Sequence, residues 1–152
     1  MMRIACLHTA QSNVAVFDAA LSDLALNDVQ LRHEVRPELL AAAEAAGGLT
    51  AAISADTVAL LTKLADNADA VLLTCSTLGP AVSDIESASS PILRVDGALA
   101  AAVAHRGGAV VVLCAVETTL EPTTKLFRSA ATNDALNILV RLVPGAWDAF
   151  KA

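Results

Sequence analysis

Short apolar runs alternate with alanine-rich amphipathic segments along the whole chain, and this alternation limits the fold more than any other feature. The apolar runs have the length of strands, and the segments between them repeat their apolar residues with helical spacing. Consecutive parallel strands need a crossover connection, which a helix usually provides. The sequence therefore predicts an α/β fold, with mostly parallel sheets and helices on both faces.

The strands and helices can be assigned from these runs and from the glycine, proline and serine residues between them. The predicted strands cover residues 3–7, 29–35, 68–74, 91–95, 109–116 and 138–143. The predicted helices cover residues 14–24, 38–46, 50–65 and 97–105, a short stretch from the turn at 75–80 to residue 88, a segment with Pro122 in its first turn, and residues 146–152. Ser12 or Asn13 is expected to cap the first helix.

Composition argues against several classes of function. The net charge is −6 and lysine and arginine are not clustered, which is atypical of nucleic-acid binding. The most apolar stretch, residues 98–116, is interrupted at 105–108, so no membrane span is expected. No signal peptide is recognisable and the 3 cysteines are odd in number, so free thiols and a cytoplasmic location are expected. Because GxGxxG, Walker A and zinc-ligand spacings are absent, no nucleotide, metal or other cofactor is expected.

Polar side chains follow several of the predicted strands, where ligands of open α/β sheets usually bind. The carboxyl ends of parallel strands meet at one rim, so these residues are expected to lie together. The candidate substrate-binding residues are His8, Thr9, Thr74, Ser76, Thr77, Thr118 and Thr119. Asp96 follows another strand and either binds substrate or caps the next helix.

Cys75 is the best candidate for a catalytic residue. It ends a buried strand and precedes a predicted helix, whose N-terminus carries partial positive charge that favours a thiolate. The backbone amides of Ser76, Thr77 and Gly79 could also hold a carboxylate. The alternative is that Cys75 is a small buried residue, as free cysteines often are. The unbroken run of hydroxyl and thiol side chains at 74–77 favours the functional interpretation.

The other cysteines and histidines have weaker functional signals. Cys6 and Cys114 lie within apolar strands, which favours a structural role for both. His8 is either a proton donor or substrate contact, or a structural histidine. His33 and His105 are expected at the surface, because one lies on an alternating strand and the other near a helix end.

Several segments resemble the aspartate/glutamate/hydantoin racemase superfamily. Residues 70–79, Ala-Val-Leu-Leu-Thr-Cys-Ser-Thr-Leu-Gly, are similar to the strand that carries that family's first catalytic cysteine. Residues 3–9 are similar to its opening strand and first substrate loop, residues 91–96 to its crossover segment, and residues 111–123 to the opening of its second lobe. The resemblance implies two pseudo-symmetric α/β lobes and isomerisation without pyridoxal phosphate. One cysteine would remove the α-proton and a second would return a proton.

The chain departs from that pattern in its second lobe. The second catalytic cysteine of the family would lie beyond residue 152, and Cys114 matches the position of Cys6, so it is not assigned the role. The expected organisation is a first lobe at 1–96 and a crossover helix with an incomplete second lobe at 97–152. Either the natural protein continues past this segment or its second lobe is degenerate.

These features predict a cofactor-independent racemase or epimerase that acts at the α-carbon of an amino acid, a hydantoin or a related carboxylate. Cys75 would serve as acid and base. Two alternatives stay open. One is a non-catalytic domain that binds a small anion or mediates assembly, and the other is a one-cysteine enzyme of the decarboxylase or maleate-isomerase type. A homo-oligomer is expected, and neither nucleic acid nor a membrane is an expected partner.

Overall fold

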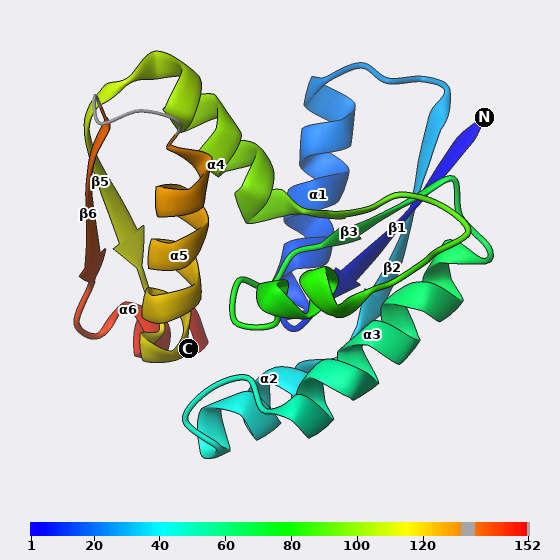
Figure 1. Cartoon of the computed structure of the whole chain (residues 1–152). Helices are drawn as coiled ribbons and strands as arrows, with labels where there is room; N and C mark the ends of the chain where they lie inside the picture. Colours follow the sequence, from blue (N-terminus) through cyan, green and yellow to red (C-terminus); the bar gives the residue numbers. More distant parts are fainter. Residues whose placement is uncertain (132–135, 152) are drawn as a thin grey trace. The chain divides into compact units, whose positions relative to one another are not determined.

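The predicted alternation of strand and helix is confirmed by the computed structural model, which describes residues 1–131 and 136–151. The chain forms two compact units, Met1–Val95 and Asp96–Ala152, each an α/β arrangement with parallel strands (Figure 1). Among the described residues, no helix has the length and apolar character needed to cross a membrane.

The first unit contains a parallel sheet in the order β2-β1-β3-β4. Its strands are β1 (Met2–His8), β2 (Val29–Val35), β3 (Ala70–Leu73) and β4 (Ile92–Arg94). The chain goes from β1 to β2 on one side and then crosses back to β3 on the other side. Strand order therefore reverses between β1 and β3, and a crevice forms outside the carboxyl ends of strands at such a point.

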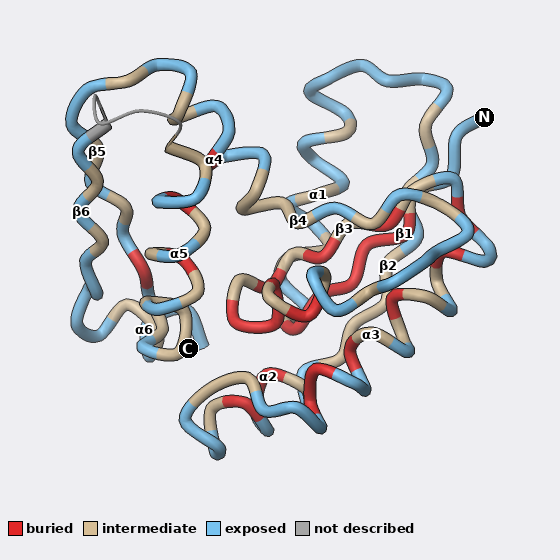
Figure 2. The backbone as a smooth tube through the Cα atoms, in the orientation of Figure 1, coloured by how far each residue is buried: buried red, intermediate tan, exposed pale blue. Residues whose placement is uncertain are grey.

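Helices cover both faces of this sheet. Right-handed crossovers place α1 (Ser12–Asp23) on one face, and α2 (Pro37–Ala45) and α3 (Ala51–Ala65) on the other (Figure 1). β1 is paired on both sides and its residues 5–8 are buried (Figure 2). The core of the unit therefore surrounds β1 and β3, and apolar side chains from α3 complete it.

Local sequence explains the boundaries of α2 and α3. Gly47 has a φ of +74°, and its amide and that of Gly48 donate to the last turn of α2, to the carbonyls of Glu44 and Ala43. Thr50 then caps α3, because its hydroxyl accepts a hydrogen bond from the Ile53 amide at 3.3 Å.

The expected cap of α1 is wrong. Ser12 and Asn13 lie inside the helix, and Gln11 occupies the N-cap position without a side-chain hydrogen bond. The chain already turns at residues 9–11 after β1, so the helix begins before either polar side chain can take the capping position.

The helix predicted to reach residue 88 is shorter than expected. It is a 3₁₀ helix, η1 (Gly79–Asp84), followed by an irregular segment up to β4. The serines of that segment bond to the end of α3: Ser89 donates to Asp66 at 2.6 Å, and Ser90 to the Ala65 carbonyl at 3.2 Å. These long-range contacts attach the segment to α3.

The second unit is a smaller parallel β-α-β arrangement preceded by a helix. Its elements are α4 (Val95–Arg106), which starts at the unit boundary, β5 (Gly108–Cys114), the short 3₁₀ helix η2 (Glu117–Thr119), α5 (Leu120–Ala130), β6 (Leu136–Leu142) and α6 (Ala146–Lys151). The predicted position of Pro122 in the first turn of α5 is confirmed. The paired residues Val111 and Leu139 are 60% and 44% exposed, so one sheet face keeps apolar side chains in solvent.

Truncation of Leu61 tests how α3 packs on the sheet. Leu61 is fully buried, so we expect Leu61→Ala to lower the free energy of unfolding by about 2–5 kcal/mol. The measurement is equilibrium urea denaturation followed by circular dichroism. Val16→Ala, at a position 61% exposed on α1, is the matched control and should change stability by about 0.5 kcal/mol or less. Equal effects of the two variants would contradict the packing described for α3.

Candidate functional site

The carboxyl ends of β1 and β3 form the candidate site. The two strands are adjacent, with Leu7 opposite Leu73, and the Thr74 amide donates to the Leu7 carbonyl at 3.0 Å. The residues that follow both strands therefore lie side by side at the point where strand order reverses. The structure brings together at this rim the predicted residues His8, Thr9, Thr74, Cys75, Ser76 and Thr77.

Cys75 lies in the loop between β3 and η1 and is 9% exposed. The side chains around it in sequence are anchored: Thr77 is 1% exposed and Leu78 is fully buried. A loop with such buried anchors holds its conformation, so the position of the Cys75 thiol is fixed by the core beneath it.

The predicted anion cradle at a helix start is not formed as expected. η1 is a short 3₁₀ helix, and the Gly79 amide donates to the Ser76 carbonyl at 3.2 Å. That amide is therefore used inside the turn, and Pro80 has no amide hydrogen to offer. Of the three predicted amides, that of Gly79 is therefore not open to an anion.

Arg94, which is not among the residues predicted from the sequence, provides a cation beside the Cys75 loop. Its guanidinium lies against Gly79 so closely that a Cβ atom at residue 79 would overlap it. A signal for Arg94 was present in the sequence, because it ends β4 and lies opposite Leu73 in the neighbouring strand. The rule that gathers strand ends at one rim applies to it as it does to Thr74.

His8 is fully buried, and both of its ring nitrogens contact protein groups. Nδ1 is 2.8 Å from Thr74 Oγ1, and Nε2 is 2.8 Å from Nδ1 of His33. Burial and the neighbouring His33 lower the pKa of His8 to about 4, against a weaker opposing effect of Asp18. His8 is therefore a neutral imidazole that orients the Thr74 hydroxyl from below.

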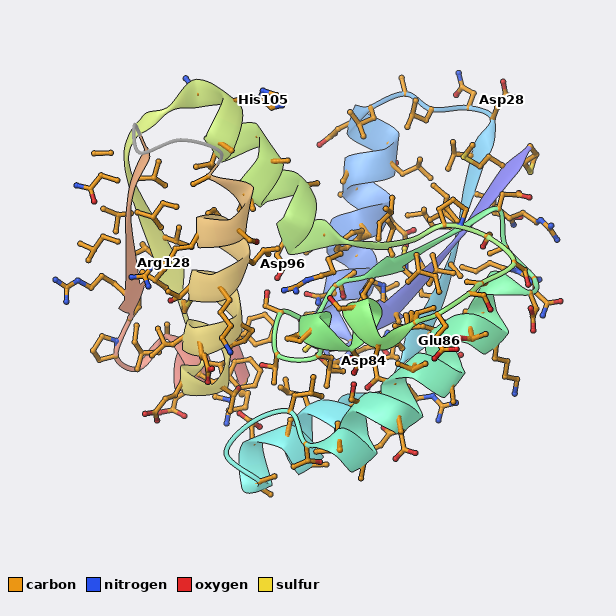
Figure 3. All side chains as sticks on the ribbon, in the orientation of Figure 1. Asp28, Asp84, Glu86, Asp96, His105 and Arg128 are labelled. Atoms are coloured by element: carbon orange, nitrogen blue, oxygen red, sulfur yellow. The ribbon has the colours of Figure 1, made fainter. Side chains whose placement is uncertain are left out.

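The expected surface position of His33 is wrong. Its side chain is only 15% exposed, its ring stacks on that of His8, and its Nε2 is 3.1 Å from Oδ1 of Asp18. The physical reason is that α1 covers this face of the sheet. The alternation of β2 contains the signal, because His33 shares its face with Val29, Leu31 and Val35. His105, in contrast, is exposed at the end of α4, as expected (Figure 3).

Cys6 and Cys114 are both buried near or within strands. Burial in the central strand, with a smaller effect of Asp18, raises the pKa of the Cys6 thiol to about 11. Cys6 is thus a neutral thiol at ordinary pH, and it lies on the same face of β1 as His8.

The remaining predicted residues lie in the second unit. Asp96 is in the first turn of α4, which begins one residue earlier, so its alternative role as the helix cap is wrong (Figure 3). Thr118 and Thr119 are in η2, where the Thr119 hydroxyl donates to the Val116 carbonyl at 2.6 Å.

The fold is similar to that of aspartate racemase from Picrophilus torridus, with a TM-score of 0.65 and 14% sequence identity. The likeness covers 92% of this chain and 62% of that one, so the chain spans less than two thirds of the racemase. A periplasmic solute-binding protein of an ABC transporter from Actinobacillus succinogenes, solved with bound D-allose, is 17% identical. The match covers 93% of this chain and 59% of the binding protein. Its TM-score of 0.39 is too low to indicate a shared fold. No protein-family model and no curated protein matches the chain.

Alkylation rates test the placement of the thiols in the first unit. We expect iodoacetamide at neutral pH to modify Cys75 faster than Cys6 in the native protein. Cys6 is fully buried in the central strand and reacts only when the sheet opens, whereas Cys75 lies in a loop. Peptide mass spectrometry over time gives both rates. In denaturant the two rates should converge, and native labelling of Cys6 as fast as Cys75 would contradict this placement of the two thiols.

Proposed function

We propose that this chain carries one half of an acid–base site that moves a proton at the α-carbon of a small carboxylate or hydantoin, with Cys75 as the acid and base. The observation that carries the proposal is the position of Cys75, which follows β3 at the strand-order reversal of a sheet with a racemase-like fold. Ligands of open parallel sheets bind at such a position.

Inversion at the α-carbon requires a base, hydrogen-bond donors for the developing charge, and a second acid. Cys75, as a thiolate, would take the α-proton and become a thiol, while the electron pair of the C–H bond passes into an enolate-like system of the substrate. Hydrogen-bond donors must then stabilise that charge, and the Ser76 hydroxyl follows Cys75 directly in the same loop. For inversion, a second acid must return a proton to the opposite face of the carbon. That acid would come from outside the first unit.

Arg94 is the group we assign to the substrate carboxylate. The chain has a net charge of −6, so an anionic substrate needs a local cation. A guanidinium binds a carboxylate with two parallel hydrogen bonds, which fixes its orientation as well as its position. The contact with Gly79 places the Arg94 guanidinium beside the loop that carries Cys75.

Replacement of Cys75 tests the catalytic proposal directly. The assay is exchange of the substrate α-proton with D₂O, followed by NMR, over a panel of aspartate, glutamate and hydantoin enantiomers together with malonate-like and maleate-like acids. We expect Cys75→Ser to lower the exchange rate by at least about 100-fold, the usual contribution of a general acid or base. Cys114→Ser is the matched control and should keep the rate.

Each outcome of that assay selects one function. Exchange that depends on Cys75 supports the proposal, and product formation only from malonate-like or maleate-like acids would favour a one-cysteine reaction instead. Binding of these acids without exchange or turnover would overturn the catalytic proposal and favour an anion-binding domain.

Gly79→Ala separates the position of Arg94 from its charge. The new methyl group would push the guanidinium away, and the stability should change by only about 1 kcal/mol or less because the end of a flexible side chain can move. We expect KM for carboxylate substrates to rise about 10-fold or more in both Gly79→Ala and Arg94→Gln, because a charge-assisted hydrogen bond is lost. Neutral hydantoins should be affected much less. An unchanged KM for carboxylates in both variants would remove Arg94 from the site.

A further inference from the structure

Three side chains that can bind a transition metal meet on the face of the sheet beneath α1. Cys6 and His8 are two residues apart in β1, so both point to the same face. The parallel register places His33 of β2 opposite Cys6. One ligand atom from each residue, a sulfur and two ring nitrogens, lies within 4.8 Å of the others. In the part of the chain that the structure describes, this is the one such group.

The hydrogen bonds around the two rings orient them toward a common point. On His33, Nε2 faces Oδ1 of Asp18 at 3.1 Å, and on His8, Nδ1 faces Oγ1 of Thr74 at 2.8 Å. The two remaining nitrogens, His8 Nε2 and His33 Nδ1, face each other at 2.8 Å. Metal-binding histidines almost always have this arrangement, with one nitrogen toward the ion and the other held by an oxygen.

The positions of the protons on His8, His33 and Thr74 decide whether the two facing nitrogens can both bind a cation. Asp18 accepts from His33 Nε2–H, which leaves a lone pair on His33 Nδ1. The Thr74 hydroxyl also lies 3.1 Å from the Leu7 carbonyl, and when it donates there, His8 Nδ1–H donates to Thr74. His8 Nε2 then presents a second lone pair to the first, and a cation between them satisfies both. When the hydroxyl turns to His8 instead, His8 Nε2–H donates to His33, which is the metal-free form.

We propose that Cys6, His8 and His33 form a site for a borderline transition metal, with Zn²⁺ preferred. The site is independent of Cys75 and of the function proposed above. Two imidazole nitrogens and a thiolate are typical zinc ligands and are poor ligands for Mg²⁺ or Ca²⁺. On binding, the Cys6 thiol loses one proton to solvent and its sulfur bonds to the metal.

Zinc binding requires the two rings to move. Tetrahedral coordination with Zn–N distances of about 2.0–2.1 Å needs the two nitrogens roughly 3.3 Å apart with both lone pairs converging on the ion. The nitrogens now face each other at 2.8 Å, so the rings must separate by about 0.5 Å and turn toward the ion. Three protein ligands leave a fourth position for water. Cys6 and His8 are fully buried but His33 is partly exposed, so the ion would enter from the side of His33 and Asp18.

Cobalt substitution tests the site in the full, tag-free chain after treatment with a chelator. We expect one Co²⁺ per chain, tetrahedral visible absorption, and a thiolate-to-cobalt charge-transfer band that Zn²⁺ abolishes by displacement. Cys6→Ser should lose the charge-transfer band, whereas Cys75→Ser and Cys114→Ser should keep it. The same spectrum in Cys6→Ser and the parent chain would overturn the proposal.

His33→Gln keeps the test decisive if Cys6→Ser fails to fold, because His33 lies nearer the surface. We expect it to weaken Zn²⁺ binding at least 100-fold in a competition assay with a chromogenic chelator, with the circular dichroism spectrum unchanged. His105→Gln, at an exposed histidine outside the cluster, is the matched control and should bind as the parent does. Asp18→Asn should weaken binding about 10–100-fold, as loss of a residue that orients a ligand does. Equal zinc affinity in His33→Gln and the parent, or no stoichiometric binding by the parent, would overturn the proposal.

Discussion

The pairing of β1 with a parallel strand on each side is the constraint on which the first unit depends. The part of β1 that lies between its two partner strands and the covering helices is out of solvent, and residues 5–8 are accordingly buried. One of these residues, His8, has two polar ring nitrogens, so it needs partners within the protein. Its partners are Thr74, just after β3, and His33 of β2, and His33 in turn contacts Asp18 of α1. The polar contacts of the unit therefore follow from its strand order.

The same constraint separates two chemical environments that lie only one residue apart just after β3. Thr74 faces inward and bonds to His8, while Cys75 begins the loop that carries the Ser76 and Thr77 hydroxyls. Burial decides the protonation of the groups below the rim. It lowers the pKa of His8 and raises that of Cys6, so both side chains are neutral there. At the rim, the Arg94 guanidinium lies against the loop at Gly79.

Much of the fold could be predicted from the sequence because parallel strands buried on both faces are nearly continuous apolar runs. β2 was predicted with its observed ends, and Thr74 and Cys75 were predicted at the end of β3. The length of the helix after Cys75 could not be predicted, because the segment that follows it is bonded through serine side chains to Asp66 and to the end of α3. The predicted surface position of His33 was wrong because His33 was assigned to the solvent-facing side of β2. The alternation of β2 in fact places it on the apolar side, together with Leu31 and Val35. Arg94 was missed because its relation to Gly79 exists only once β3 and β4 are paired.

Thr74 connects the cluster of Cys6, His8 and His33 to the Cys75 loop, because it bonds to His8 and immediately precedes Cys75. The Thr74 hydroxyl has a single hydrogen and two acceptors in range, the Leu7 carbonyl and His8 Nδ1. Its orientation is therefore tied to the tautomer of His8, which in turn depends on what lies between His8 and His33. Thr74 immediately precedes Cys75, so the residue that bonds to the buried imidazole also begins the loop that carries the thiol. The parallel sheet thus places a buried polar cluster next to the candidate site, with one threonine shared between them.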